Sequence, residues 1–127
     1  MAEYTILSID DDASARMLFE MMLTRSGFDF LQAEDADAAL EVLETVIPDL
    51  IMTDIQLPGK SGIELVAELR QRDDLDQTAI MVLSAFQSET MVEDAMRAGA
   101  DDFFRKPLPM KELTKILTDL IHKRRGE

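Results

Sequence analysis

The sequence predicts an α/β fold in which helices cover both faces of a doubly wound, five-stranded parallel sheet. Five short apolar segments alternate with five longer segments of helical periodicity, a pattern that calls for right-handed crossovers between parallel strands. Two of the apolar segments, residues 50–52 and 79–83, are almost continuously apolar, as expected of strands buried on both faces. With 127 residues, 46% of them apolar, the chain 1–127 is expected to form one domain.

The first strand and helix follow from the pattern near the amino terminus. Residues 4–9 are typical of a buried strand, and Asp12 is placed to cap a helix over residues 13–26 that ends at Gly27. Helical spacing predicts that one apolar stripe of this helix faces the core: Met17, Leu18, Met21 and Met22. The nine methionines of the chain are interpreted mostly as packing residues rather than as a binding surface.

The second strand is predicted at an edge of the sheet. Residues 28–33 carry polar side chains that suit an edge strand better than a central one. A helix over residues 35–46 follows, and Pro48 keeps it from continuing. Its apolar residues repeat at helical spacing: Ala36, Ala39, Leu40 and Leu43.

The third strand carries the residue on which the functional interpretation depends. Its apolar run, residues 50–52, leads into Asp54, and a turn-forming segment over residues 58–62 follows. A carboxylate is therefore expected where a buried strand reaches a loop. Ser61 and Glu64 form a capping box for the next helix, whose apolar residues are Leu65, Val66 and Leu69.

The rest of the chain supplies two more strands and two more helices. Residues 79–83 predict the fourth strand, and a helix over residues 88–98 follows, with Gly99 as its stop. The inward side chains of that helix are predicted to be Val92, Ala95 and Met96. Residues 102–105 predict a short fifth strand. The final helix, residues 109–123, has the clearest apolar stripe: Leu113, Ile116, Leu117, Leu120 and Ile121.

Polar residues follow four of the strands at one edge of the predicted sheet. Asp10 and Asp11 come after the first strand, Asp54 after the third, Ser84 after the fourth and Lys106 after the fifth. The carboxyl ends of parallel strands meet at one edge, where open α/β folds place their ligand sites. We therefore expect these side chains to lie close together.

Carboxylates gathered in this way repel one another unless a cation offsets their charge. Mg²⁺ prefers a few carboxylates together with water and phosphate oxygens, which fits such a cluster. A carboxylate beside a metal and a fixed ammonium, as Asp54 would be beside Lys106, can attack and hold a phosphoryl group. The plainer alternative is that residues 10–12 serve only as turn and cap residues.

Together these residues resemble the receiver domain of two-component response regulators. The resemblance covers nearly the whole chain and rests on the acidic pair after the first strand, Asp54 ahead of a proline and a glycine, Ser84 followed by alanine, and Lys106 followed by proline. It implies a flavodoxin-like fold with strand order 2-1-3-4-5, which places the first and third strands side by side. It also implies a cytoplasmic signalling domain.

The resemblance implies a role for each residue at this edge. Asp54 is the expected phosphoacceptor, and Asp11 and Asp54 are the expected direct ligands of Mg²⁺. Asp10 would hold a metal-bound water, and the backbone carbonyl of Gln56 would be the remaining protein ligand. These assignments come from the resemblance and agree with the chemistry of the residue types.

A conformational switch is implied as well. Lys106 would pair with the phosphoryl group and the Ser84 hydroxyl would move toward it, leaving space for the aromatic ring of Phe103 to turn inward. Phe103 stands where the family often has a tyrosine. The expected outcome is a changed surface formed by the helix over residues 88–98, the strand over residues 102–105 and the final helix.

The resemblance and the charge together suggest the partners. The expected donor is a sensor histidine kinase or a phosphotransfer protein, and the expected recipient is a downstream effector protein or an output domain, with a phosphorylation-dependent homodimer compatible with both. A formal charge of −13 argues against direct binding of nucleic acid or an anionic membrane.

No apolar run reaches the roughly 20 residues of a transmembrane helix, and the absence of cysteine is compatible with the cytosol. His122, the single histidine, is expected at a solvated surface position.

Two other functions remain open from the sequence. The first is a binding module of the same fold that is never phosphorylated, which would predict a damaged site. The second is an Mg²⁺-dependent phosphohydrolase of the haloacid dehalogenase type, because Asp10 and Asp12 loosely match that superfamily's signature. The hydrolase needs an acidic pair after the lysine, whereas Asp101 and Asp102 precede Lys106. The leading interpretation is a signalling domain that is not an enzyme beyond weak self-catalysed phosphotransfer and dephosphorylation.

Overall fold

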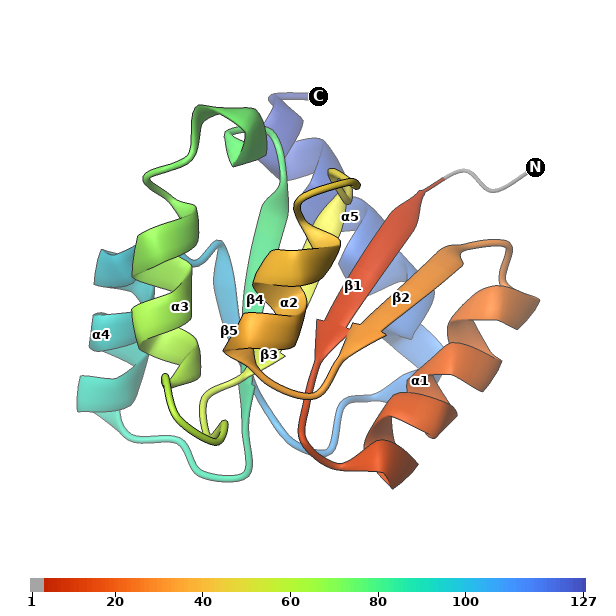
Figure 1. Cartoon of the computed structure of the whole chain (residues 1–127). Coiled ribbons are helices and arrows are strands. Elements are labelled where there is room, and N and C mark those ends of the chain that lie inside the picture. The colour runs from red at the N-terminus through yellow and green to blue at the C-terminus, as the bar shows by residue number, and fades with distance from the viewer. Residues whose placement is uncertain (1–3) are drawn as a thin grey trace.

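A parallel sheet of five strands forms the centre of the molecule, in the order β2-β1-β3-β4-β5 (Figure 1). The computed structural model describes residues 4–127 of the chain. Each neighbouring pair of strands is parallel, so the predicted flavodoxin-like sheet and its order are confirmed. The strands are β1 (Thr5–Ile9), β2 (Asp29–Ala33), β3 (Leu50–Asp54), β4 (Ala79–Ser84) and β5 (Asp102–Arg105).

Helices cover both faces of this sheet, as the doubly wound prediction requires (Figure 1). One face carries α1 (Ala13–Arg25) and α5 (Leu113–Arg125). The other face carries α2 (Ala36–Val42), α3 (Gly62–Leu69) and α4 (Glu89–Ala98). Two short 3₁₀ turns, Asp73–Leu75 and Met110–Glu112, precede β4 and α5.

Alternate side chains of the strands fill two hydrophobic cores. Ile6 and Leu50 are partners in the sheet and pack with α1 and α5, whereas Leu7 and Ile51 are partners that pack with α2, α3 and α4. All four side chains are fully buried, and each such burial contributes roughly 1.5–3 kcal/mol. The central strands β3 and β4 are buried almost throughout, and β2 is only partly buried at the edge, as predicted.

Side-chain caps determine where the helices begin, just beyond the carboxyl ends of the strands. The Asp12 carboxylate accepts a hydrogen bond from Ser14 N at 2.9 Å at the start of α1, and Ser61 Oγ accepts one from Glu64 N at 3.2 Å at the start of α3. Both caps agree with the sequence prediction. Gly99, with φ of 116°, ends α4 in the left-handed conformation that favours glycine.

The predicted inner stripe of the first helix is wrong for three of its four residues. Met17, Leu18 and Met21 are 62%, 51% and 50% exposed, whereas Phe19 and Leu23 are the buried residues of α1. Apolar residues lie all around this helix, so periodicity alone does not select the face that docks on the sheet. Met22 is half-buried and packs against the core.

Other predictions about helices also need correction. The helix predicted over residues 35–46 ends at Val42, and a turn follows it. Met96 on α4 is 43% exposed, and the half-buried Met91 packs on the core instead. The interpretation of the methionines as mostly core residues is therefore wrong for the helices, although Met52 and Met81 are fully buried in strands. The last helix begins at Leu113 rather than at residue 109, because a 3₁₀ turn precedes it.

Candidate functional site

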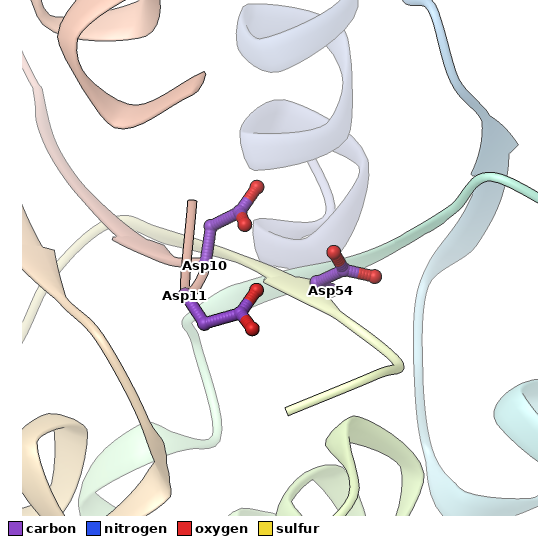
Figure 2. A group of neighbouring side chains, drawn as sticks. All are labelled: Asp10, Asp11 and Asp54. Atoms are coloured by element: carbon purple, nitrogen blue, oxygen red, sulfur yellow. The ribbon is translucent and has the colours of Figure 1, made fainter. Parts of the chain in front are cut away.

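Three carboxylates meet at the carboxyl end of β1 and β3. One oxygen atom from each of Asp10, Asp11 and Asp54 can be chosen so that all lie within 4.8 Å of one another (Figure 2). The register explains this closeness, because Ile9 pairs with Thr53 and the next residue along each strand is an aspartate. The adjacency of β1 and β3 thus brings together acids separated by more than 40 residues in the sequence.

Asp10 is the most buried of these acids, with 2% of its surface exposed. Its Oδ1 accepts a hydrogen bond from Asp12 N at 2.9 Å, and its Oδ2 accepts one from Lys106 Nζ at 3.0 Å. The Arg16 side chain also donates to the Asp10 carbonyl oxygen. A charged carboxylate is stable at this depth because donors satisfy both of its oxygens. The alternative that these acids are only turn residues holds for Asp12, whose carboxylate caps α1.

Asp54 ends β3 with its side chain 13% exposed. Its Oδ2 accepts a hydrogen bond from Lys106 Nζ at 2.9 Å, and its Oδ1 accepts one from Gln56 N at 3.3 Å. The backbone beyond it is tied to β4, because Ile55 N donates to Leu83 O at 3.1 Å. The carboxylate is therefore held in place from both sides while part of it still faces solvent.

Lys106 bridges Asp10 and Asp54, although β5 is at the far edge of the sheet from β1. Burial lowers the pKa of Lys106, but hydrogen bonds and charge interactions with Asp54 and Asp10 outweigh burial, so that the pKa lies above its ordinary value of 10.5. The ammonium is thus charged at neutral pH. One ammonium opposes three carboxylates, which leaves an excess of negative charge at this edge.

The residues present fit a hard divalent cation. Three carboxylates offer oxygen atoms within one small region, one of them on the exposed side chain of Asp11, and the uncompensated charge is negative. No sulfur or imidazole ligand adjoins them among the described residues, a donor set that favours Mg²⁺ over a softer metal. The predicted magnesium ligands Asp10, Asp11 and Asp54 therefore do come together. Gln56, the fourth predicted ligand, lies in the same turn through its amide contact with Asp54.

The two predicted switch residues lie on the neighbouring strands. Ser84 ends β4 fully buried, and its Oγ accepts a hydrogen bond from Phe86 N at 3.1 Å. Phe103 on β5 pairs with Val82 in the sheet and is 8% exposed, within the core under α4. The inward turn of this ring remains a prediction, and the ring is already buried in this structure.

Comparison with known proteins identifies the family of this site. A family profile described as the response regulator receiver domain matches residues 6–118, a range that includes all the acids of the site and Lys106. The chain belongs to the response regulator receiver family. Receiver domains are generally non-enzymatic signalling modules of two-component phosphorelays. They bind Mg²⁺ at an acidic cluster of this kind.

Individual relatives agree with this membership. The chain is 38% identical over 105 residues to the chemotaxis protein CheY of Bacillus subtilis, an alignment that covers 82% of this chain and 86% of that protein. It is 34% identical over 123 residues to the phosphate regulon transcriptional regulatory protein PhoB of Pseudomonas aeruginosa, covering 97% of this chain. Its structure is similar to that of the chemotaxis response regulator CheY4 of Vibrio cholerae, with a TM-score of 0.85, 27% identity and coverage of 94% and 98% of the two chains.

Several relatives are much longer than this chain. The match covers 54% of the Pseudomonas PhoB protein and 32% of a cyclic di-GMP phosphodiesterase of Thermotoga maritima, to which the chain is 32% identical over 120 residues. The relatives thus differ in what accompanies the receiver region. No helix within residues 4–127 has both the length and the apolar character needed to cross a membrane.

The single histidine lies away from the acidic site. His122 is near the end of α5, where its Nε2 is 2.8 Å from the hydroxyl of Tyr4, the residue just before β1. Tyr4 lies at the amino end of β1, whereas Asp10 lies at its carboxyl end. His122 is half-exposed, in agreement with the predicted surface position, and it also contacts the edge of the Tyr4 ring.

Proposed function

We propose that this receiver domain, residues 1–127, accepts a phosphoryl group on Asp54 and passes the signal on through a change of surface. The observation that carries the proposal is the contact of the Asp54 carboxylate with Lys106 Nζ at 2.9 Å, beside two further carboxylates within 4.8 Å. A partly exposed nucleophile, a fixed cation and a candidate metal site coincide at one point. Family membership and this geometry support the same chemistry.

The proposed donor is the phosphohistidine of a sensor kinase or of a phosphotransfer protein. An oxygen of the Asp54 carboxylate attacks phosphorus, an oxygen–phosphorus bond forms, and the nitrogen–phosphorus bond of the donor breaks. The electron pair of that bond stays on the imidazole nitrogen, which takes up a proton and leaves as neutral imidazole. The product is an acyl phosphate on Asp54.

Lys106 has two tasks in this proposal. Before the reaction it neutralises part of the charge of Asp54 and Asp10, so that an anionic donor can approach. During transfer its ammonium is close enough to Asp54 to pair with the oxygens of the incoming phosphoryl group. Its raised pKa keeps it charged throughout the neutral range.

The proposed metal ligands are Asp11 and Asp54 directly, Asp10 through a water, and the backbone carbonyl of Gln56. When bound, Mg²⁺ would supply positive charge that offsets the carboxylates and the phosphoryl oxygens. The burial of Asp10 and the exposure of Asp11 suit these unequal roles, because only the exposed acid can rearrange freely to accommodate an ion.

The proposed output is the surface of α4, β5 and α5, which would act on an effector protein, an output domain or a second copy of the chain. Ser84 stands at the start of the loop into α4, and Phe103 lies in the core under that helix. Movement of the Ser84 hydroxyl toward a phosphoryl group would break its hydrogen bond with Phe86 N and so release the start of this loop. A cytoplasmic location and weak self-catalysed dephosphorylation belong to the same proposal.

The hydrolase alternative finds little support at this site. Its second acidic pair would have to lie near Lys106. Asp101 instead lies at the amino end of the strands, where it binds Arg70 and Arg124. Asp12 is used as the cap of α1. The silent binding module would predict a damaged site, whereas the expected residue types are all present: Asp10, Asp11, Asp54, Ser84 and Lys106.

Incubation with acetyl phosphate and Mg²⁺, followed by mass spectrometry of peptides, tests the proposal. We expect a mass gain of one phosphoryl group on the peptide that contains Asp54, slow to decay and dependent on the metal. No mass gain with any small donor would favour the silent module. Rapid release of phosphate over many turnovers would favour the hydrolase, and a phosphoryl group on another residue would contradict the assignment of Asp54.

A further inference from the structure

Gly62, the first residue of α3, lies directly against the backbone of Asp54. A β-carbon at position 62 would overlap the carbonyl oxygen of Asp54 and would lie 2.9 Å from both the Asp54 carbonyl carbon and Ile55 Cα. All three of these atoms are backbone atoms, so no flexible side chain can move aside to make room. Gly62 does not have the positive φ of Gly59, Gly99 or Gly126, so the requirement for glycine here is one of space.

The strand side of this contact has little freedom to yield. The Asp54 carbonyl oxygen accepts a hydrogen bond from Thr53 Oγ1 at 3.0 Å. Ile55 N donates to Leu83 O at 3.1 Å, which fastens the same peptide to β4. Thr53 is fully buried, and a shift of this peptide would carry the Asp54 carboxylate away from Lys106.

The helix side is also held. Gly62 N donates to Ile55 O at 2.8 Å, so the helix start and the residue after Asp54 are already in contact through a short hydrogen bond. Ser61 caps α3, and Leu65 and Val66 are fully buried one turn further on. Outward movement of the helix would open the core around those two side chains.

We infer that Gly62 is a positioning residue for the proposed phosphoacceptor: its missing side chain lets α3 press against the Asp54–Ile55 peptide and so sets the place of the Asp54 carboxylate. The inference rests on the proposed function of Asp54. It adds that three elements build the site, because α3 packs on the same peptide that β4 and the Thr53 hydroxyl hold by hydrogen bonds. For efficient phosphoryl transfer, the reacting carboxylate must be held within about half an ångström of its productive position.

The test compares Gly62→Ala with two matched variants. Gly59→Ala makes the same chemical change three residues earlier, where a side chain meets nothing within 4 Å but φ is +79°, so it costs stability without any collision. Leu69→Ala removes a fully buried side chain at the far end of α3 and destabilises the fold without touching Asp54. Each protein is first melted, and the rate of Asp54 phosphorylation by acetyl phosphate with saturating Mg²⁺ is then measured at a temperature where all of them are folded.

We expect Gly62→Ala to lower the rate at least about tenfold, and both control variants to stay within about twofold of the unmodified chain. A displaced amide resonance of Ile55 in Gly62→Ala should accompany the slower reaction. A folded Gly62→Ala protein with an unchanged rate, or an equal loss of rate in Leu69→Ala, would overturn the inference. Failure of the unmodified chain to react on Asp54 would instead overturn the proposed function, and the inference with it.

Thr53→Val provides a second test if Gly62→Ala does not fold. This substitution keeps the volume of the side chain but removes the hydroxyl that holds the same carbonyl from the strand side. We expect a folded protein with a rate lowered at least about threefold. A rate equal to that of the unmodified chain, together with an unfolded Gly62→Ala protein, would mean that Gly62 serves only the fold.

Discussion

The two ends of the sheet differ in how their charges are matched. At the carboxyl end, Asp10, Asp11 and Asp54 gather around one ammonium, that of Lys106. At the amino end, Asp101 alone receives two guanidinium groups, from Arg70 at 2.7 Å and from Arg124 at 3.3 Å. The acids at one end therefore outnumber the cation beside them, whereas the carboxylate at the other end is matched by guanidinium groups of the chain itself.

The paired end ties several segments of the chain together. Arg70 donates to the carbonyl oxygens of Gly99, Leu75 and Thr78 at 2.8, 3.0 and 3.0 Å, in addition to Asp101. Burial lowers the pKa of Arg70, and the charge of Asp101 partly offsets that effect. This network binds the end of α3 to the start of β4 and to the turn after α4. Its partners are all supplied by the chain, so it serves stability.

The contrast suggests how to separate function from structure in this fold. Charges that satisfy one another within the chain hold elements together, whereas acids left in excess need an external cation and remain available for chemistry. Four measurements test this distinction, and they follow in order of expected effect.

Asp54→Asn should reduce phosphorylation by acetyl phosphate at least about a thousandfold, because it removes the proposed nucleophile. Asp101→Asn at the opposite end should leave the rate of phosphorylation close to that of the unmodified chain. The amount of phosphorylated protein is read by intact-mass spectrometry with saturating Mg²⁺. Retained labelling of the Asp54→Asn chain, or loss of labelling in the Asp101→Asn chain, would contradict the division between the two ends.

Arg70→Met should lower the free energy of unfolding by about 3 kcal/mol, because it takes the Arg70 partner from the mostly buried carboxylate of Asp101 and from three carbonyl groups. Urea titration followed by circular dichroism measures the change. Arg97→Met is the matched control: its exposed pair with Asp94, at 3.7 Å, should be worth at most about 1 kcal/mol. Equal losses in the two variants would show that the paired end has no special importance for stability.

Asp11→Asn should raise the free energy of unfolding in the presence of a chelator, by about 1 kcal/mol. Unit charges about 5 Å apart repel by roughly 3 kcal/mol at an effective dielectric near 20, and the exposure of Asp11 screens much of this. For the unmodified chain, about 10 mM Mg²⁺ with a dissociation constant of about 1 mM should add roughly 1.4 kcal/mol.

The two effects on the acidic end should not add, because Asp11→Asn removes a proposed metal ligand. Thermal melts of both proteins, with chelator and with Mg²⁺, provide the four values needed. Identical melting of the unmodified chain in both buffers would refute the metal site. A less stable Asp11→Asn protein in chelator would refute the charge excess.

The smallest expected effect is on alkaline stability. The pKa of Lys106 in the folded state lies above its ordinary value of 10.5, so its contribution to stability is complete below about pH 10.5 and is lost as the pH rises through the folded-state pKa. Stability of the unmodified chain should therefore fall more steeply above that pH than stability of Lys106→Met. Urea midpoints measured across this range give both slopes. Equal slopes of stability against pH in the two proteins would mean that Asp10 and Asp54 do not raise the pKa of Lys106 in the folded state.

Much of the fold was predictable because its signals are local. Near-continuous apolar runs indicated the central strands, and Asp12, Ser61 and Gly99 marked helix ends through interactions within a few residues. The acidic pair, Asp54, Ser84 and Lys106 each follow a strand, and parallel strands place their carboxyl ends together. The members of the candidate site could therefore be named from the sequence and from its resemblance to a family.

Other features depend on how the elements pack. Apolar residues occur on several faces of α1. Which of them are buried, Phe19 and Leu23 rather than Met17, depends on how the helix docks on the sheet. The partners of Arg70 are distributed over segments up to 31 residues away, so no local pattern reveals the network.

The alternation of strands and helices, the caps and the identity of the acids can be predicted from the sequence alone, because each depends on side-chain chemistry and short-range spacing. Only the packed domain shows that Lys106 binds Asp10 as well as the expected Asp54, and that Gly62 lies against the Asp54 carbonyl. Contacts of this kind depend on the distance between elements far apart in the chain, and only close packing of the whole domain sets that distance.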